Sequence, residues 1–127
     1  MSQTMYVVDA FTKELFKGNA AAVMILDQWL PETMMQAIAI ENNLSETAFA
    51  MTDESGRYHI RWFSPVTEIA FCGHATLATA YVLFNYYHQN TAIAFYAPEI
   101  GHFNVMQLSD GRIEMDFPNL QPEPINN

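Results

Sequence analysis

The sequence predicts a single α+β domain in which a curved, mixed β-sheet or open barrel wraps around one central apolar helix. The chain has 127 residues, which is enough for one hydrophobic core and too few for two ordinary domains. Hydrophobic residues make up 50% of it, which argues against disorder. Strand-like and helix-like segments are interleaved, and one helical segment, residues 75–86, has no polar face to present to water. We therefore expect that helix at the centre of the domain.

The first half of the chain contains four predicted strands and one helix. The strands, each rich in apolar residues and bounded by polar turns, are residues 5–11, 20–26, 46–52 and 58–63. The helix falls within residues 27–45, because Pro31 suits a first helical turn and apolar residues from Met34 to Ala39 recur at helical spacing. The polar turn at 53–57 contains a glycine and predicts that the last two strands form a hairpin.

The second half places the apolar helix before three more strands. These strands are residues 92–97, 102–108 and 112–117, with polar turns between them. The last ten residues hold three prolines and no periodic pattern. This composition predicts that residues 119–127 form a tail or an interdomain linker. The folded domain is expected to span residues 1–118.

Charge and cysteine content exclude several classes of function. Fourteen acidic and five basic residues give a net charge of −9, and the basic residues are scattered. Sequence-independent binding to nucleic acid needs clustered Lys and Arg, so no nucleic-acid partner is expected. The longest apolar run, residues 75–84, is shorter than the roughly 20 residues that span a bilayer, and the start of the chain lacks a secretory pattern. Cys72 is the only cysteine and cannot form an internal disulfide. We expect a cytoplasmic protein with no membrane partner.

The apolar helix is introduced by Cys-Gly-His at residues 72–74, which a purely structural helix does not require. A buried helix start carries backbone N–H groups without helical partners, together with the positive end of the helix dipole. A small carboxylate would satisfy both. Gly73 allows a ligand to approach the backbone closely, and His74 is placed to donate or accept a proton.

Two other polar positions interrupt apolar segments. Ser45 and Glu46 lie at the start of the third strand, and a carboxylate at the edge of a core suits a general base near neutral pH. Asn19 lies at the entrance of the second strand. Glu46 also fits a solvated strand start, and Asn19 a turn residue. His74 also fits a capping histidine, and Cys72 a small buried hydrophobe.

Four segments resemble, in order and spacing, the N-terminal half of the phenazine-biosynthesis PhzF-like family. They are VDAFTKELFKGNAAAV at 8–23, NLSETAF at 43–49, RWFSPVTEIAFCGHATLATA at 61–80 and MDFP at 115–118. GN, LSET and CGHAT together are far more specific than any one alone. The resemblance implies the diaminopimelate epimerase fold, in which two similar domains each curl a mixed sheet around a central helix and the active site lies between them.

The resemblance implies cofactor-independent proton transfer at a carbon next to a carboxylate or conjugated acid. Glu46 and His74 match the catalytic positions, the first as acid/base carboxylate and the second at the helix start that contacts the substrate. The substrate-binding positions it implies are Asn19, Ser45, Cys72, Gly73 and Ala75. Of these, the cysteine stands where true epimerases carry one of two catalytic thiols, although the PhzF-like pattern does not rely on a thiol there.

Nothing in the sequence matches the family's second domain, so three hypotheses stay open. In the first, a homodimer mate, a missing C-terminal domain or a separate chain supplies the other half of an isomerase site. In the second, a truncated domain binds small carboxylates without catalysis. In the third, the chain is an assembly module. No cofactor is expected, because there is no Gly-rich phosphate loop. The spacing of the four histidines predicts no metal site.

Overall fold

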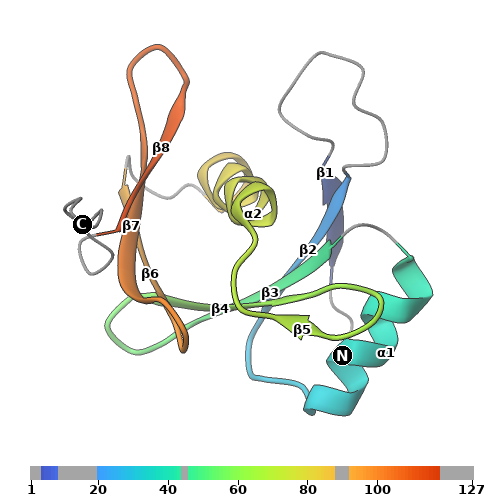
Figure 1. The fold of residues 1–127 in the computed structure, drawn as a ribbon. Coiled ribbons are helices and arrows are strands. Elements are labelled where there is room, and N and C mark those ends of the chain that lie inside the picture. Colours follow the sequence, from blue (N-terminus) through green and yellow to red (C-terminus); the bar gives the residue numbers. More distant parts are fainter. Residues whose placement is uncertain (1–3, 9–19, 44–45, 88–91, 118–127) are drawn as a thin grey trace, which may run out of the picture.

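The computed structural model describes residues 4–8, 20–43, 46–87 and 92–117 and has the expected α+β architecture (Figure 1). Its strands are β1 (Met5–Val8), β2 (Ala21–Leu26), β3 (Glu46–Thr52), β4 (Tyr58–Phe63), β5 (Glu68–Ile69), β6 (Ala92–Ala97), β7 (Gly101–Gln107) and β8 (Ile113–Asp116). Its helices are α1 (Glu32–Asn42) and α2 (Gly73–Tyr86). The sheet curls around α2, and α1 packs on its outer face.

The described strands form one mixed sheet. Their order is β1-β2-β3-β4-β6-β7-β8, with β5 paired to β4 beside this path. The pairs β2–β3 and β4–β6 are parallel, and the remaining pairs are antiparallel. Parallel neighbours need a crossover connection, and each crossover here contains a helix, α1 for the first pair and α2 for the second. The two helices therefore lie where the chain returns across the sheet.

The predicted hairpin of β3 and β4 is confirmed, and its turn is organised by Asp53. One carboxylate oxygen of Asp53 accepts hydrogen bonds from the backbone N–H of Ser55 at 2.8 Å and of Arg57 at 3.2 Å. The other lies 2.9 Å from Nε2 of His59. Gly56 adopts a φ of 92°, a left-handed conformation that favours glycine. Local turn chemistry thus sets the register of the two strands.

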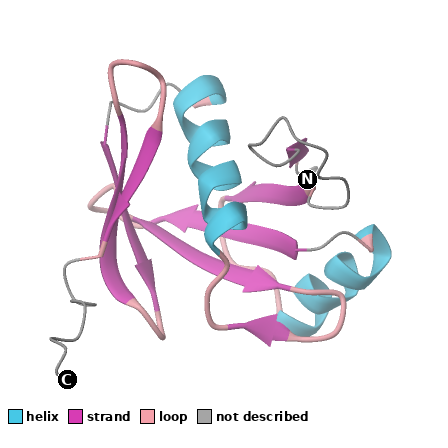
Figure 2. Cartoon of the chain, turned by 45° about the horizontal axis from the view of Figure 1, so that its top comes forward, coloured by secondary structure: helices cyan, strands magenta, loops and turns pink. Residues whose placement is uncertain are grey.

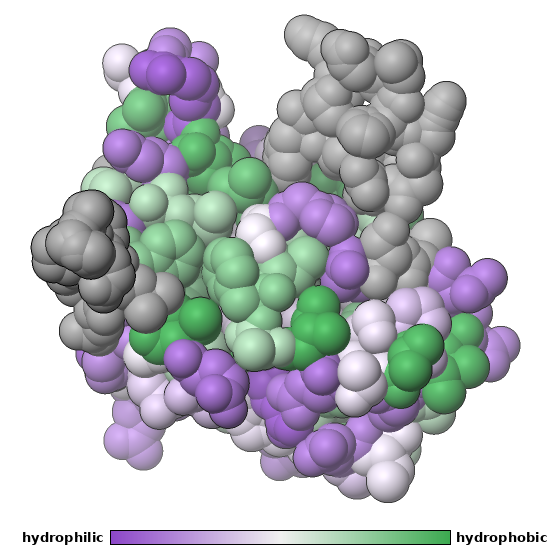
Figure 3. Space-filling view, in the orientation of Figure 1, coloured by the Kyte–Doolittle hydropathy of each residue, from purple (hydrophilic) through white to green (hydrophobic). Residues whose placement is uncertain are grey.

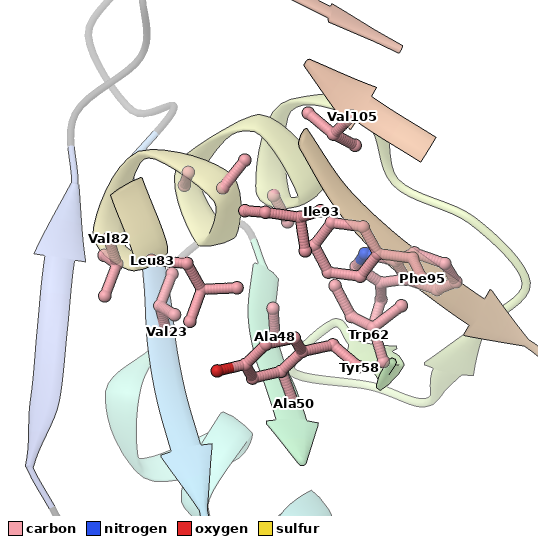
Figure 4. Close-up of a cluster of buried hydrophobic side chains, with 14 of the residues drawn as sticks. Val23, Ala48, Ala50, Tyr58, Trp62, Val82, Leu83, Ile93, Phe95 and Val105 are labelled. Carbon is pink, nitrogen blue, oxygen red and sulfur yellow. The ribbon is translucent and has the colours of Figure 1, made fainter. Parts of the chain in front are cut away.

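Figure 2 shows from a second direction that α2 lies on the concave side of the sheet, and the main core fills the space between them. Figure 4 shows side chains from both layers meeting there. The labelled members of this cluster are Val23, Ala48, Ala50, Tyr58, Trp62, Val82, Leu83, Ile93, Phe95 and Val105. Alanines on α2, such as Ala75 and Ala80, are fully buried and let the helix backbone approach the strands.

A second, smaller cluster joins α1 to the convex side of the sheet. Met35 and Ala39 are buried against Phe49 and Phe63, whose rings meet edge to face with centroids 5.5 Å apart. Met34, which we expected to share the buried face, is 47% exposed. The buried face of α1 is narrower than predicted because a single helix against a sheet contacts it along one stripe.

Helix α2 ends at Tyr86, as predicted, but its start and the burial of its last turns differ from the prediction. It begins at Gly73 rather than Ala75, so the histidine belongs to its first turn. Towards its C-terminus Tyr81 and Tyr86 are 40% and 55% exposed, although the sequence predicted burial on every side. The sheet covers α2 incompletely there, and the exposed ring of Tyr86 stacks on Tyr6 of β1 with centroids 5.0 Å apart.

Some sequence predictions lie beyond the described residues. Residues 9–11 of the first predicted strand and the predicted tail, residues 119–127, belong to this group. Strand β5 was not predicted, because two residues are too few to show a period. Within the described ranges, neither helix is long and apolar enough to cross a bilayer.

Candidate functional site

Glu46, the first residue of β3, and His74, in the first turn of α2, lie side by side. Oε1 of Glu46 and Nε2 of His74 are 2.9 Å apart, with side-chain exposures of 18% and 32%. Both atoms are buried, yet neither makes an aligned hydrogen bond to any described residue. The distance suits an ion pair or a shared proton. The poor alignment leaves both atoms with unused hydrogen-bonding capacity, which in a buried site calls for a third group.

The position of Glu46 follows from the start of β3. The parallel register places Glu46 opposite Ala21 of β2. Nδ2 of Asn42, at the end of α1, donates to Oγ1 of the buried Thr47 at 3.1 Å. This bond ties the end of the helix to the strand that follows it. The carboxylate is therefore presented from a fixed strand end rather than from a free loop.

The start of α2 is held by a chain of buried polar groups. Nε1 of Trp62 donates to Oγ1 of Thr76 at 3.0 Å, and that hydroxyl donates to the carbonyl oxygen of Cys72 at 2.8 Å. The backbone N–H of Thr76 bonds the same carbonyl at 3.1 Å. This is the first backbone bond of the helix, so the amides of residues 73–75 have no carbonyl partner within it. The positive end of the helix dipole faces the same place.

Cys72 occupies the N-cap of α2 in an extended conformation and makes no side-chain capping hydrogen bond. Its Sγ lies 3.6 Å from Nδ1 of His74. Burial raises the pKa of the thiol to about 11, and the nearby charge of Glu46 acts in the same direction. At neutral pH the group is therefore a neutral thiol and not a thiolate base.

An aromatic side chain that the sequence did not single out borders this site. Phe71 is 36% exposed and makes edge-to-face contacts with Trp62 and Phe117, with centroids 5.3 Å and 5.5 Å away. A Cβ added at Gly73 would lie 3.6 Å from the Phe71 ring. Figure 3 has the same orientation as Figure 1. It shows an apolar surface with hydrophilic groups beside it in the middle of this face, where Figure 1 places α2. The sequence did not predict Phe71 as part of the site, because an aromatic residue next to Cys72 in an apolar segment is typical of a core.

The structure brings five of the seven predicted site residues to one place. These are Glu46, Cys72, Gly73, His74 and Ala75, from the start of β3 and the start of α2. Asn19 and Ser45 lie outside the described residues. The roles assigned to all seven from the resemblance stay predictions.

A groove of about 590 Å³ lies apart from this cluster, in the fork where β5 and β6 pair with different parts of β4. Its wall includes Trp29, Arg61 and Tyr96. Arg61 is already engaged there, because its Nε and Nη2 donate to the carboxylate of Glu68 at 2.8 Å and 2.7 Å. The five predicted site residues that the structure describes are not among those that line this groove.

Comparisons with known proteins agree with this architecture. The sequence profile of the phenazine biosynthesis-like protein family, PhzC-PhzF, matches residues 8–127. An uncharacterized isomerase of Pseudomonas aeruginosa is 47% identical over 124 residues, which are 98% of this chain and 47% of that protein. The crystal structure of a PhzF family protein from Enterococcus faecalis superposes with a TM-score of 0.79 at 54% identity, covering 86% of this chain and 42% of that one.

A more distant structure extends the likeness in fold. A predicted epimerase from Pseudomonas aeruginosa is 22% identical and superposes with a TM-score of 0.70, over 90% of this chain and 42% of that one. The fold is therefore epimerase-like, as the sequence resemblance implied. The chain spans about half the length of the relatives it matches. By its profile match, its sequence identity and its fold, the chain belongs to the phenazine biosynthesis-like PhzC-PhzF family.

Proposed function

We propose that this domain catalyses proton transfer at a carbon next to the carboxylate of a small acid, without a cofactor. The observation that carries the proposal is the buried pair of Glu46 and His74, 2.9 Å apart, beside the backbone amides at the start of α2, which have no carbonyl partner within the helix. A carboxylate base, an imidazole and a binding place for an anion are the parts that such a reaction needs.

In the proposed reaction the substrate carboxylate binds the amides of residues 73–75. The Glu46 carboxylate then removes a proton from the adjacent or conjugated carbon. The electron pair of the broken C–H bond becomes part of a π system extended over the substrate carboxylate, where the helix dipole and amides stabilise the added negative charge. The proton is returned to another carbon, or to the opposite face of the same carbon. Atoms and electrons balance without an oxidant.

His74 completes the acid–base pair in this proposal. Its Nε2 faces the Glu46 carboxylate, so it can hold the proton that Glu46 takes up or release one to the substrate. Cys72 contributes no thiolate at neutral pH, since its pKa is raised to about 11. We therefore assign acid and base to the other two residues and treat the cysteine as part of the wall.

The proposed site is one half of a cleft. The matched relatives are about twice as long as this chain, and Phe71 beside the helix start is 36% exposed. Proton transfer of this kind needs reacting groups held on both sides and exclusion of water. We propose that a second copy of the chain supplies the opposite side in a homodimer. A C-terminal domain or a separate partner chain would serve the same purpose.

Exchange with deuterated water tests the chemistry. The chain is incubated in D₂O with a panel of unsaturated cyclic acids and amino acids, and loss of proton signals is followed by NMR. Glu46→Gln should lower the exchange rate by about 100-fold or more, and His74→Gln by a similar factor. Glu41→Gln, which changes an exposed glutamate of α1, is the matched control. Exchange that survives in Glu46→Gln would show that this carboxylate is not the base.

Light scattering during gel filtration tests the partner requirement. Diluting the protein through its dimer–monomer transition should lower the exchange rate per chain in proportion to the dimer fraction. A monomer of 14.5 kDa that catalyses exchange at full rate would overturn the half-site argument. Carboxylate binding at the amides of residues 73–75 without any exchange would instead support the binding-only hypothesis.

A further inference from the structure

We propose that Glu46, Cys72 and His74 form a binding site for a soft divalent transition-metal ion, with Zn²⁺ the best fit. The Cys sulfur, one imidazole nitrogen and one carboxylate oxygen all lie within 4.8 Å of one another. The three residues offer the ligand types that zinc sites use. This inference does not depend on the proposed reaction, because it concerns metal binding alone.

The geometry of the Cys–His half of the site is close to that of a coordinated pair. Two ligand atoms on one tetrahedral zinc, at about 2.3 Å for sulfur and about 2.0 Å for nitrogen, are roughly 3.5 Å apart. Sγ of Cys72 and Nδ1 of His74 are 3.6 Å apart. The two residues are neighbours at the rigid start of α2, so an ion can bridge them with little rearrangement.

Glu46 supplies the third ligand from a different element. In the present conformation Oε1 approaches Nε2, the nitrogen on the other side of the ring from the one that faces Cys72. Coordination of an ion held by the other two residues therefore requires the glutamate side chain to rotate and place a carboxylate oxygen on the ion. Both Oε1 and Nε2 lack an aligned hydrogen bond among the described residues, so this movement exchanges the 2.9 Å contact with Nε2 for a bond to the ion.

Three protein ligands leave the fourth tetrahedral position open to water or to an anion. Coordination replaces the thiol proton of Cys72, which passes to solvent, because a bound divalent ion deprotonates a coordinating thiol. Thiolate selects zinc, cobalt or cadmium over magnesium or calcium. An ion at this position occupies the carboxylate and the imidazole together, so it blocks any proton transfer that needs them.

Titration with Co²⁺ tests the site directly, because a cobalt–thiolate bond has its own charge-transfer absorption and Cys72 is the only thiol in the chain. We expect one Co²⁺ per chain, with tetrahedral visible bands that Zn²⁺ removes stoichiometrically. His74→Gln and Glu46→Gln should each weaken binding by more than about tenfold, since loss of a direct ligand exceeds the effect of losing an outer-shell partner. Cys72→Ser should abolish the charge-transfer band.

Controls separate this site from adventitious binding. His102→Gln removes an exposed histidine of β7 and should leave the titration unchanged. His74→Gln keeps the test valid if Cys72→Ser does not fold, because His74 is 32% exposed and outside the core. The proposal is overturned if no charge-transfer band appears with wild-type protein. It is equally overturned if the band persists at full affinity in both His74→Gln and Glu46→Gln, which would mean a simple thiol adduct.

Discussion

Oε1 of Glu46 and Nε2 of His74 lie 2.9 Å apart, although the chain between them forms the whole β3–β4 hairpin, β5 and the turn into α2. The distance between them depends on the register of the sheet, which places Glu46, and on the position of α2, which places His74. The interactions that fix these two elements can be tested separately from the chemistry.

Replacing Gly73 with alanine should separate ligand binding from folding. The backbone at Gly73 does not adopt a positive φ, and an added Cβ would make only ordinary contact with Phe71, at 3.6 Å. Gly73→Ala should therefore leave the free energy of unfolding unchanged or raise it, by up to about 1 kcal/mol. The methyl group would obstruct an anion at the amides, weakening carboxylate binding by about 1–3 kcal/mol. Urea unfolding and NMR titration measure the two effects.

Gly111→Ala is the control for that experiment. Gly111 has a φ of 91° with nothing within 4 Å of an added Cβ, so alanine there is strained without being crowded. It should cost about 1 kcal/mol or more of stability and leave carboxylate binding unchanged. If Gly73→Ala lowered stability without weakening carboxylate binding, while Gly111→Ala weakened binding, the glycine at 73 would not be explained by ligand binding.

Two threonines of α2 allow the hydrogen bond from Trp62 to be isolated. Thr76 and Thr79 are both fully buried, and each hydroxyl donates to the carbonyl four residues earlier at 2.8 Å. The hydroxyl of Thr76 also accepts a hydrogen bond from Nε1 of Trp62 at 3.0 Å. Thr76→Val should therefore destabilise the protein by about 1–3 kcal/mol more than Thr79→Val, because it leaves a buried indole N–H unpaired.

Urea denaturation of both threonine variants gives the comparison. A double-mutant cycle with Trp62→Phe should show that most of the difference is coupling between Trp62 and Thr76. Equal destabilisation by the two valines would mean that the indole does not anchor the start of α2.

The turn of the β3–β4 hairpin should make stability depend on pH in the acid range. Hydrogen bonds from Ser55, followed by the one to His59, lower the pKa of Asp53 well below its ordinary value, which is about 4. A lowered pKa means that the stabilisation is complete above the unfolded value and is lost as the pH falls towards the folded value. The unfolding free energies of wild type and Asp53→Asn should differ above about pH 5. They should converge on acidification, and a constant difference down to pH 2 would contradict this.

Cys72 should react slowly with alkylating agents at neutral pH. Burial, the largest contribution, raises the pKa of its thiol to about 11, so only about one molecule in 10⁴ carries the reactive thiolate at pH 7. The rate of iodoacetamide modification, followed by mass spectrometry, should rise about tenfold per pH unit up to that range. The same protein unfolded in urea should react rapidly at pH 8. Fast modification of the folded protein at pH 7 would mean that Cys72 carries a thiolate at neutral pH and is a candidate base.

The elements that could be predicted from the sequence are those with a clear period. The β3–β4 hairpin and strands β6 to β8 were placed because alternating apolar residues and Gly-containing turns mark them locally. Strand β5 could not be found, because pairing with β4 rather than its own sequence makes it a strand. The start of α2 was set too late, because Gly73 has low helix propensity and tertiary packing overrides that preference.

The site was predictable in its parts and not in its assembly. Burial of a helix that begins with Cys-Gly-His indicated a place for an anion, and the family resemblance pointed to Glu46. The distance between Glu46 and His74, and the approach of Cys72 to both, follow from sheet register, which no local pattern contains. The spacing of histidines predicted no metal ligands for the same reason. Phe71 looked like a core residue and is partly exposed.

The connection from β5 to α2, residues 70–72, has an evolutionary consequence. On one side of this connection, strand β5 is held by the ion pair between Nη2 of Arg61 and Oε1 of Glu68, which are 2.7 Å apart. On the other side, the start of α2 is held by the hydrogen bond from Trp62 to Thr76. An insertion there would displace His74 from Glu46, whereas residues added at the exposed tip of the β3–β4 turn would leave that distance unchanged. Variation in length among descendants of this chain should therefore accumulate at the hairpin tip, while the path into α2 keeps its number of residues.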